Sequence, residues 1–343
     1  VCGNRAVRPL SSMQLIVSIT LFLCTSHGYR MRSSGEPKLL RSSRPLELSD
    51  PLSGLSRLLL AFNPAAGHGG IARSQSQVMA EQSGPRRVAV SGAGGQTGQL
   101  VFRKLLARPD DFTPIGLVRT EESRAGLIED GLPADSIVVA DVTDRESVAS
   151  AMKGCEALVI CTSAKPVPSG MNNETGRPIF GFPNGQPEQV DWLGQKSQID
   201  AAKAVGSGTH VVICSSMGGT DPSNMLNSIA REELPDGSFK GGNILLWKRK
   251  AEIYLIASAL PYTIVHPGGL INEPGAKREI VIGVDDDRTE GERSIPRDDV
   301  AEVLVQALLD PAYRGRSFDI RSKAEGEGTV TTDFAALLEK LEG

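Results

Sequence analysis

Cysteine and histidine are scarce, with five and four residues among 343. Two of the cysteines precede residue 84, and only Cys155, Cys161 and Cys214 follow it. Three is an odd number for a disulfide framework, and Cys161 and Cys214 end apolar, strand-like runs in which free cysteine packs as a small hydrophobic residue. We therefore expect a folded part suited to a reducing compartment. No Cys/His/Asp cluster has metal-ligand spacing, so no metal is predicted.

An excess of basic residues is also missing. The chain has 37 Lys and Arg against 41 Asp and Glu, and nine of the basic and four of the acidic residues precede residue 84. The remaining 28 and 37 make the rest of the chain mildly acidic. Such a balance gives no electrostatic reason to expect a nucleic-acid partner.

No apolar run is long enough for a membrane helix, which needs about 20 residues. The run from Leu15 to Cys24 has about half that length and is followed by small residues and then by an Arg- and Ser-rich stretch. Residues 1–83 are therefore predicted to be a targeting leader with a disordered linker. A signal followed by a transit-like segment favours the plastid stroma. A plain secretory signal, or a flank and tail of a cytoplasmic protein, are the alternatives.

From residue 84 to 343 short apolar runs alternate with helical patterns. Runs that are apolar on both faces are typical of parallel strands covered on both sides by helices. The sequence thus predicts one α/β domain, a doubly wound parallel sheet or Rossmann fold. The strand-like runs are 88–90, 115–118, 137–139, 158–160, 211–213 and 262–265, and the helix-like segments are 97–107, 144–153, 189–205, 245–259 and two after residue 297. Two polar insertions, 165–188 and 270–294, follow strands at the edge where such sheets bind ligands.

A glycine-rich turn joins the first strand to the first helix. Gly92, Gly95 and Gly98 form a GxxGxxG pattern, in which the glycines allow a tight turn, a close backbone approach to a pyrophosphate and close helix packing. The phosphate is expected on the helix N-terminus. The predicted dinucleotide-binding residues of this turn are Gly92, Gly94, Gly95, Gln96, Thr97 and Gly98.

The residue that follows the second strand indicates which dinucleotide binds. Arg119 stands where an NAD enzyme usually has an acid for the ribose hydroxyl, and its guanidinium suits a 2′-phosphate. NADP(H) is therefore the predicted cofactor, unless Arg119 is only a surface arginine. Residues at the ends of the third and fourth strands are expected near the adenine and the nicotinamide ribose, with simple strand capping as the alternative: Asp141, Val142, Thr162 and Ser163.

These motifs resemble the atypical short-chain dehydrogenase/reductase family, in its NmrA-like group and the plant and algal NAD(P)-binding branch. The resemblance covers residues 86–343 and is carried by residues 91–98, 116–120, 187–192, 215–219, 247–252, 267–269 and 297–301. It implies an NADP(H) site that also includes Ser215, Lys250 and Pro267, without indicating a substrate.

The catalytic residues depart from the family pattern. Standard members place a Tyr and a Lys four residues apart on one helix, with a Ser after the fifth strand. Here Ser215 or Ser216 is expected in the serine position and Lys250 in the lysine position, but the tyrosine slot is then Leu246. His266 is a candidate acid or base because histidine titrates near neutrality, with a satisfied, hydrogen-bonded histidine as the alternative.

Two classes of function follow. The first is an NADPH-dependent reductase of a small carbonyl, quinone or enone that works without the usual tyrosine. The second is a non-catalytic NADP(H)-sensing or scaffold protein with a regulatory protein partner. The expected partner is a small-molecule substrate for the reductase and a regulatory protein for the sensor or scaffold.

Overall fold

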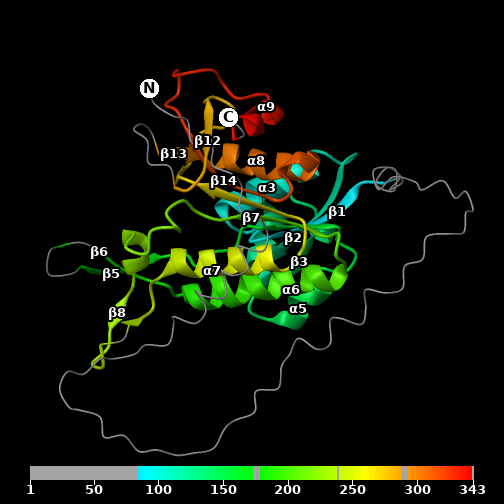
Figure 1. The fold of residues 1–343 in the computed structure, drawn as a ribbon. Coiled ribbons are helices and arrows are strands. Elements are labelled where there is room, and N and C mark those ends of the chain that lie inside the picture. Colours follow the sequence, from blue (N-terminus) through cyan, green and yellow to red (C-terminus); the bar gives the residue numbers. More distant parts are fainter. Residues whose placement is uncertain (1–83, 173–175, 177, 238, 287–292, 342–343) are drawn as a thin grey trace, which may run out of the picture. The chain divides into compact units, whose positions relative to one another are not determined.

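The computed structural model describes residues 84–341 except 173–175, 177, 238 and 287–292. The predicted leader therefore lies outside the described residues. An eight-stranded sheet runs through the centre of the described part, in the order β12-β14-β10-β7-β4-β1-β2-β3 (Figure 1). Its strands are β1 (Arg86–Ser91), β2 (Phe112–Val118), β3 (Ile137–Val139), β4 (Ala157–Ile160), β7 (His210–Cys214), β10 (Tyr262–Pro267), β12 (Ile280–Gly283) and β14 (Arg316–Ser322).

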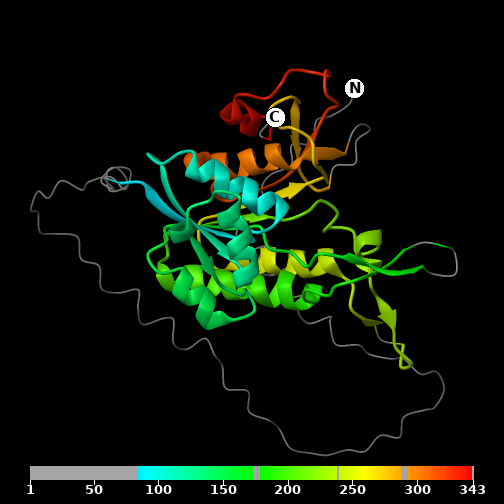
Figure 2. The same cartoon turned by 180° about the vertical axis from the view of Figure 1, so that it is seen from behind.

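Helices cover both faces of this sheet. Helices α3 (Gln96–Leu106) and α8 (Arg297–Leu309) lie on one face, and α5 (Arg145–Ala151), α6 (Gln195–Val205) and α7 (Ile244–Ala257) lie on the other (Figures 1 and 2). Each face has its own buried core, because successive side chains of a strand point to opposite sides. Val88 and Val159 pack toward α3 and α8, whereas Ala89 and Leu158 pack toward α5 and α6. The predicted doubly wound fold is confirmed.

Several elements were not predicted. Helix α4 (Glu121–Glu129) buries only Leu127, so it carries no apolar stripe. Strand β12 is antiparallel to β14. The insertion at 165–188 contains a hairpin of β5 (Val167–Asn172) and β6 (Pro178–Gly181). Also not predicted are η1 (Ala134–Ser136), η3 (Met225–Ser228), β8 (Glu232–Glu233), β9 (Phe239–Lys240), β11 (Gly269–Ile271), β13 (Ser294–Pro296) and η4 (Pro311–Tyr313). The π-helix η2 (Glu188–Gly194) overlaps the helix predicted for 189–205, and α9 (Phe334–Glu339) lies in the second helix predicted after residue 297.

The glycine-rich turn leaves no room for side chains. Gly92 has a φ of +72°, and a Cβ atom there would lie 2.9 Å from the Cys161 carbonyl oxygen at the end of β4. A Cβ atom on Gly98 would lie 2.2 Å from the Gly92 carbonyl oxygen. The start of α3 is therefore packed directly against the carboxyl ends of β1 and β4. The strand order reverses between these two strands, and doubly wound sheets bind ligands at that point.

Substitution of Gly98 tests this packing. We expect Gly98→Ala to lower the free energy of unfolding by about 1–3 kcal/mol, because the added methyl group pushes α3 away from the turn. The control is Gly126→Ala in α4, where a Cβ atom meets nothing within 4 Å and alanine favours the helix by up to about 1 kcal/mol. Urea unfolding of both variants gives the two changes. Equal changes would contradict the close packing at Gly98.

Candidate functional site

A groove of about 510 Å³ lies at the carboxyl ends of the first four parallel strands. We call it the glycine-loop groove. The structure brings together there most of the residues predicted to bind a dinucleotide, namely Gly92, Gly94, Gly95, Arg119, Asp141, Val142, Thr162 and Ser163. It also adds lining residues that the sequence did not indicate, namely Ser123, Lys165, Asn184 and Gln189. These come from α4, the insertion at 165–188 and η2.

The N-terminus of α3 fits a pyrophosphate. Gly95 is the N-cap residue and no side chain caps the helix, so its first-turn N–H groups remain available to an anion. Gln96 and Thr97 follow as the first helical residues, but their side chains do not line the groove. They would contribute backbone N–H groups only. Gly98 is buried and has a packing role.

Arg119 lies at the rim of the groove and is exposed. Its Nη1 donates to the Asn184 carbonyl oxygen at 2.8 Å, and its Nη2 donates to Asn184 Oδ1 at 3.0 Å. These bonds attach the guanidinium to the insertion at 165–188. Since an arginine carries five N–H donors, it retains capacity for a phosphate ligand.

Local hydrogen bonds already hold the predicted adenine and ribose residues. Asp141 Oδ1 accepts from Thr143 N at 2.8 Å and from Thr143 Oγ1 at 2.7 Å, which fixes the turn after β3. Thr162 Oγ1 accepts from Gln198 Nε2 at 3.2 Å, and the Ser163 hydroxyl donates to the Ala164 carbonyl at 3.4 Å. These contacts are of the kind expected for strand capping, the alternative prediction for these residues. They also hold the side chains that form the walls of the groove in place.

The buried lysine of α7 is Lys248 rather than Lys250. Lys250 is exposed, and its ammonium lies 4.5 Å from the ring centre of Trp192 and 5.0 Å from that of Trp247. Lys248 is buried, and its Nζ lies 2.9 Å from Asp191 Oδ1. The placement predicted for Lys250 is therefore wrong. Residues two apart on a helix point to nearly opposite sides, so only one of the two lysines can face the sheet. The sequence alone did not show which of them is buried.

Asp191 connects Lys248 to the groove. Its Oδ2 accepts a hydrogen bond from the Ala164 N–H at 3.0 Å, directly after the groove residues Thr162 and Ser163. Burial alone would lower the pKa of Lys248, but the nearby Asp191 carboxylate raises it above its ordinary value. The lysine is therefore charged at neutral pH and supplies a fixed positive charge beneath the end of β4.

The residue one turn before this lysine is apolar. Ile244 lies four positions before Lys248, on the same side of the helix, and is buried in a small cluster with Phe182 and Val190. Leu246, the predicted tyrosine slot, is on the outer side and is 36% exposed. Neither position supplies a phenol. The residue on the same side of α7 as the buried lysine is therefore Ile244 and not Leu246.

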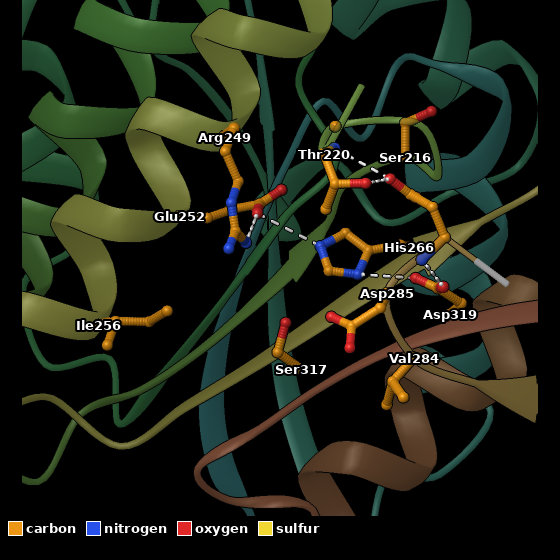
Figure 3. A pocket seen from close by; sticks show the side chains of 12 residues that line it. Ser216, Thr220, Arg249, Glu252, Ile256, His266, Val284, Asp285, Ser317 and Asp319 are labelled. Carbon is orange, nitrogen blue, oxygen red and sulfur yellow. Dashed lines mark hydrogen bonds and ion pairs between the residues drawn. The ribbon is translucent and has the colours of Figure 1, made fainter. Parts of the chain in front are cut away.

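The two serines after β7 face different surroundings. The Ser215 hydroxyl is buried and donates to the Glu252 carboxylate. The Ser216 hydroxyl donates to the Met217 carbonyl oxygen at 3.0 Å. Ser216 lines both a pocket of about 370 Å³ around His266, shown in Figure 3, and a cleft of about 590 Å³ that includes Pro267.

His266 lies between two carboxylates in that pocket. Its Nε2 is 3.3 Å from Glu252 Oε2 and its Nδ1 is 3.2 Å from Asp319 Oδ1 (Figure 3). Burial alone would lower the pKa of His266, but hydrogen bonds to Asp319 and Glu252 raise it to about 9. The imidazolium is charged at neutral pH with both nitrogens engaged. This is the satisfied histidine of the alternative prediction, not one that titrates near neutrality.

The histidine makes stability depend on pH. Its folded pKa of about 9 exceeds the ordinary value of 6.5, so its contribution is complete below pH 6.5 and is lost as pH rises through 9. We expect the free energy of unfolding, from urea titrations, to fall across this window in the wild type and to fall less in His266→Gln. Groups that do not face His266 titrate equally in both proteins. Parallel pH curves for the two would contradict the ion pairs.

Comparison with known proteins identifies the family. A family profile described as NAD(P)H-binding matches residues 92–311. The chain is 47% identical to an uncharacterized chloroplastic protein of Arabidopsis thaliana, over 75% of this chain and 76% of that protein. It is 42% identical to sanguinarine reductase of Eschscholzia californica, over 77% and 98% respectively. A solved protein of Bacillus halodurans, assigned as an NAD-dependent epimerase/dehydratase, is 26% identical with a TM-score of 0.54, over 75% of this chain and all of that one.

The chain belongs to the NAD(P)H-binding family. The plant relatives agree with the branch indicated by the sequence motifs. The family also supports a reductase-like protein. Within residues 84–341, gaps aside, no helix is long and apolar enough to cross a membrane.

Proposed function

We propose that this protein is a plastid NADPH-dependent reductase whose acceptor takes a hydride without a strong protein acid. The observation that carries the proposal is the buried Lys248–Asp191 pair, which is bonded to the segment after β4 that lines the glycine-loop groove, with Ile244 where a proton-donating phenol would be needed. Quinones and enones fit this arrangement better than simple carbonyls, because their reduction depends less on a strong acid. The similarity to a plant reductase and to a chloroplastic protein supports the reaction class and the compartment.

Binding would use groups that the groove already holds in place. The backbone N–H groups after Gly95 would hold the pyrophosphate, and Arg119 the 2′-phosphate. Asp141 and Val142 line the part expected for the adenine, while Thr162 and Ser163 line the part expected for the nicotinamide ribose. An acidic residue in place of Arg119 would instead repel the 2′-phosphate of NADPH.

The chemistry would rest mainly on positioning. When bound, the nicotinamide supplies the hydride. Lys248 keeps a positive charge near the ends of β4 and β7, which favours developing negative charge on an acceptor oxygen. The Ser216 hydroxyl lies at the edge of the Pro267 cleft and would orient the acceptor there. Protonation of the product would then come from water.

Replacement of Arg119 tests cofactor choice. Arg119→Ala removes a charge-assisted bond of about 1.5–3 kcal/mol, which predicts about 10- to 100-fold weaker NADPH binding and little change for NADH. The control is Arg108→Ala, which removes an arginine that pairs with Glu302 away from the groove. Fluorescence titration measures the affinities of the wild type and both variants for NADPH and for NADH. Equal losses for both cofactors would reject Arg119 as the phosphate ligand.

Replacement of Ile244 tests the missing acid. We expect the wild type to oxidise NADPH with quinones or enones, and Ile244→Tyr to gain activity with simple aldehydes because a phenol then lies one turn from Lys248. Leu246→Tyr is the matched control, since it places the phenol on the exposed side. Thermal unfolding shows whether each variant is folded. No turnover by the wild type with any acceptor would overturn the reductase proposal.

One contact favours the alternative of an NADP(H) sensor. Arg119 is bonded to Asn184 in the insertion at 165–188, so a 2′-phosphate bound by the same guanidinium would be coupled to the insertion through that contact. A sensor predicts tight NADPH binding, no turnover, and cofactor-dependent cleavage of this insertion in limited proteolysis. Turnover without such a change favours the reductase.

A further inference from the structure

Two thiols that the proposed reaction does not use meet at the end of the sheet. Strands β4 and β7 are parallel neighbours, and Ile160 pairs with Ile213, so Cys161 and Cys214 occupy the next position of the same register. Both cysteines are free. Both side chains pack against the core that faces α3 and α8, which puts them on the same face of the sheet. The two thiols are joined by a side-chain hydrogen bond.

The backbone geometry suits a disulfide. Neighbouring strands lie about 4.7–4.9 Å apart, and disulfide-bonded cysteines have Cα atoms about 4.4–6.8 Å apart. Directly opposed positions on one face therefore fall within the permitted range of Cα separations. The Cβ atoms of a disulfide lie about 3.5–4.5 Å apart, which is closer than neighbouring strands, so side-chain rotation and a small approach of the two strand ends bring the sulfur atoms to bonding distance.

The surroundings shift the pKa values of the two thiols in opposite directions. The hydrogen bond from Cys161 lowers the pKa of Cys214 against the effect of burial, and the charges of Lys248, His266 and Arg297 act in the same direction. The thiolate is the form that attacks disulfides. Cys161, the hydrogen-bond donor, has its pKa raised, so Cys214 is the group that ionises first.

One of the two cysteines lies at the surface of the glycine-loop groove. Cys161 lines that groove together with Gly92 and Thr162. A Cβ atom on Gly92 would lie 2.9 Å from the Cys161 carbonyl oxygen, so this residue and the glycine turn cannot move independently. Cys155, the remaining cysteine among the described residues, is buried at the end of α5 and donates to the Ala151 carbonyl oxygen at 3.8 Å.

We propose that Cys161 and Cys214 form a reversible disulfide at the floor of the glycine-loop groove, and that a bound dinucleotide protects them from oxidation. The oxidant is a disulfide RSSR, such as glutathione disulfide. A cysteine thiolate attacks one sulfur of RSSR, giving a mixed disulfide and RS⁻. The second cysteine loses its proton and attacks the cysteine sulfur of the mixed disulfide, releasing the second RS⁻. Two electrons and two protons pass from the cysteines to give two RSH.

The bond would also change the groove. Forming it pulls Cys161 toward β7, and Gly92 must follow because the two backbones are in contact. The oxidised protein is therefore expected to bind NADPH about tenfold more weakly than the reduced one, and dithiothreitol is expected to restore the affinity. The protection and affinity claims depend on the proposed cofactor site, whereas formation of the disulfide does not.

The test treats the full chain with glutathione disulfide and maps peptides by mass spectrometry, with and without NADPH. The expected product is a peptide pair joined through Cys161 and Cys214, absent in Cys161→Ser and Cys214→Ser and present in Cys155→Ser, which is the matched control. In the two pair variants the remaining cysteine is expected to stop at the glutathione adduct. Near-ultraviolet circular dichroism confirms that each variant is folded, and Cys161→Ala replaces Cys161→Ser if the latter is not.

The outcomes separate this proposal from the proposed function. Glutathione adducts without a Cys161–Cys214 bond, or a bond to Cys155, would overturn the disulfide. A disulfide that forms equally fast when fluorescence shows NADPH to be bound would overturn its link to the groove. A disulfide that forms in a protein with no NADPH affinity would reject the cofactor proposal and leave the disulfide established.

Discussion

The structure depends on how closely the glycine turn approaches the end of β4. The Gly92 carbonyl leaves no room for a Cβ atom on Gly98, and the Cys161 carbonyl leaves none on Gly92. These two contacts bring the start of α3 to the point where the strand order reverses. Because Gly92 and Gly98 have no side chains, the uncapped N-terminus of α3 lies at the groove formed by the ends of four strands. An anionic ligand fits that arrangement.

Two buried cationic side chains, Lys248 and His266, lie beside carboxylates. A buried ammonium or imidazolium is stable only with carboxylates beside it, and Lys248 has Asp191 whereas His266 has Glu252 and Asp319. The partners come from η2, α7 and β14, so they tie the segments around the groove to the sheet. Lys248 acts as a fixed charge in this scheme, and His266 acts as a structural ion pair. Neither replaces the missing phenol.

The sequence predicted those parts of the fold that depend on local apolar patterns. Six strands and the glycine turn after the first were identified because their residues leave few alternatives. Five of these strands are buried, whereas β3 has two exposed valines. Helix α4 was not identified, since it buries only Leu127, and β14 was not, since its buried Asp319 interrupts the apolar run. Long-range pairing has no signature in a local pattern.

The residues of the candidate site that were predicted are likewise those that belong to a local pattern. Groove residues defined by a strand end or a turn, such as Arg119 and Thr162, line the groove as expected. The lysine was misplaced, because two lysines stand two residues apart and only the packing of α7 against η2 shows which is buried. Asn184 and Asp191 were missed because their roles arise from contacts with distant segments.

Calorimetric titration of the wild-type chain with NADPH and with NADH in one buffer tests whether the groove binds the phosphorylated dinucleotide. We expect both to bind at one site and NADPH to bind at least about tenfold more tightly, through the charge of Arg119 on the 2′-phosphate. Equal affinities, or no binding of either dinucleotide, would contradict it.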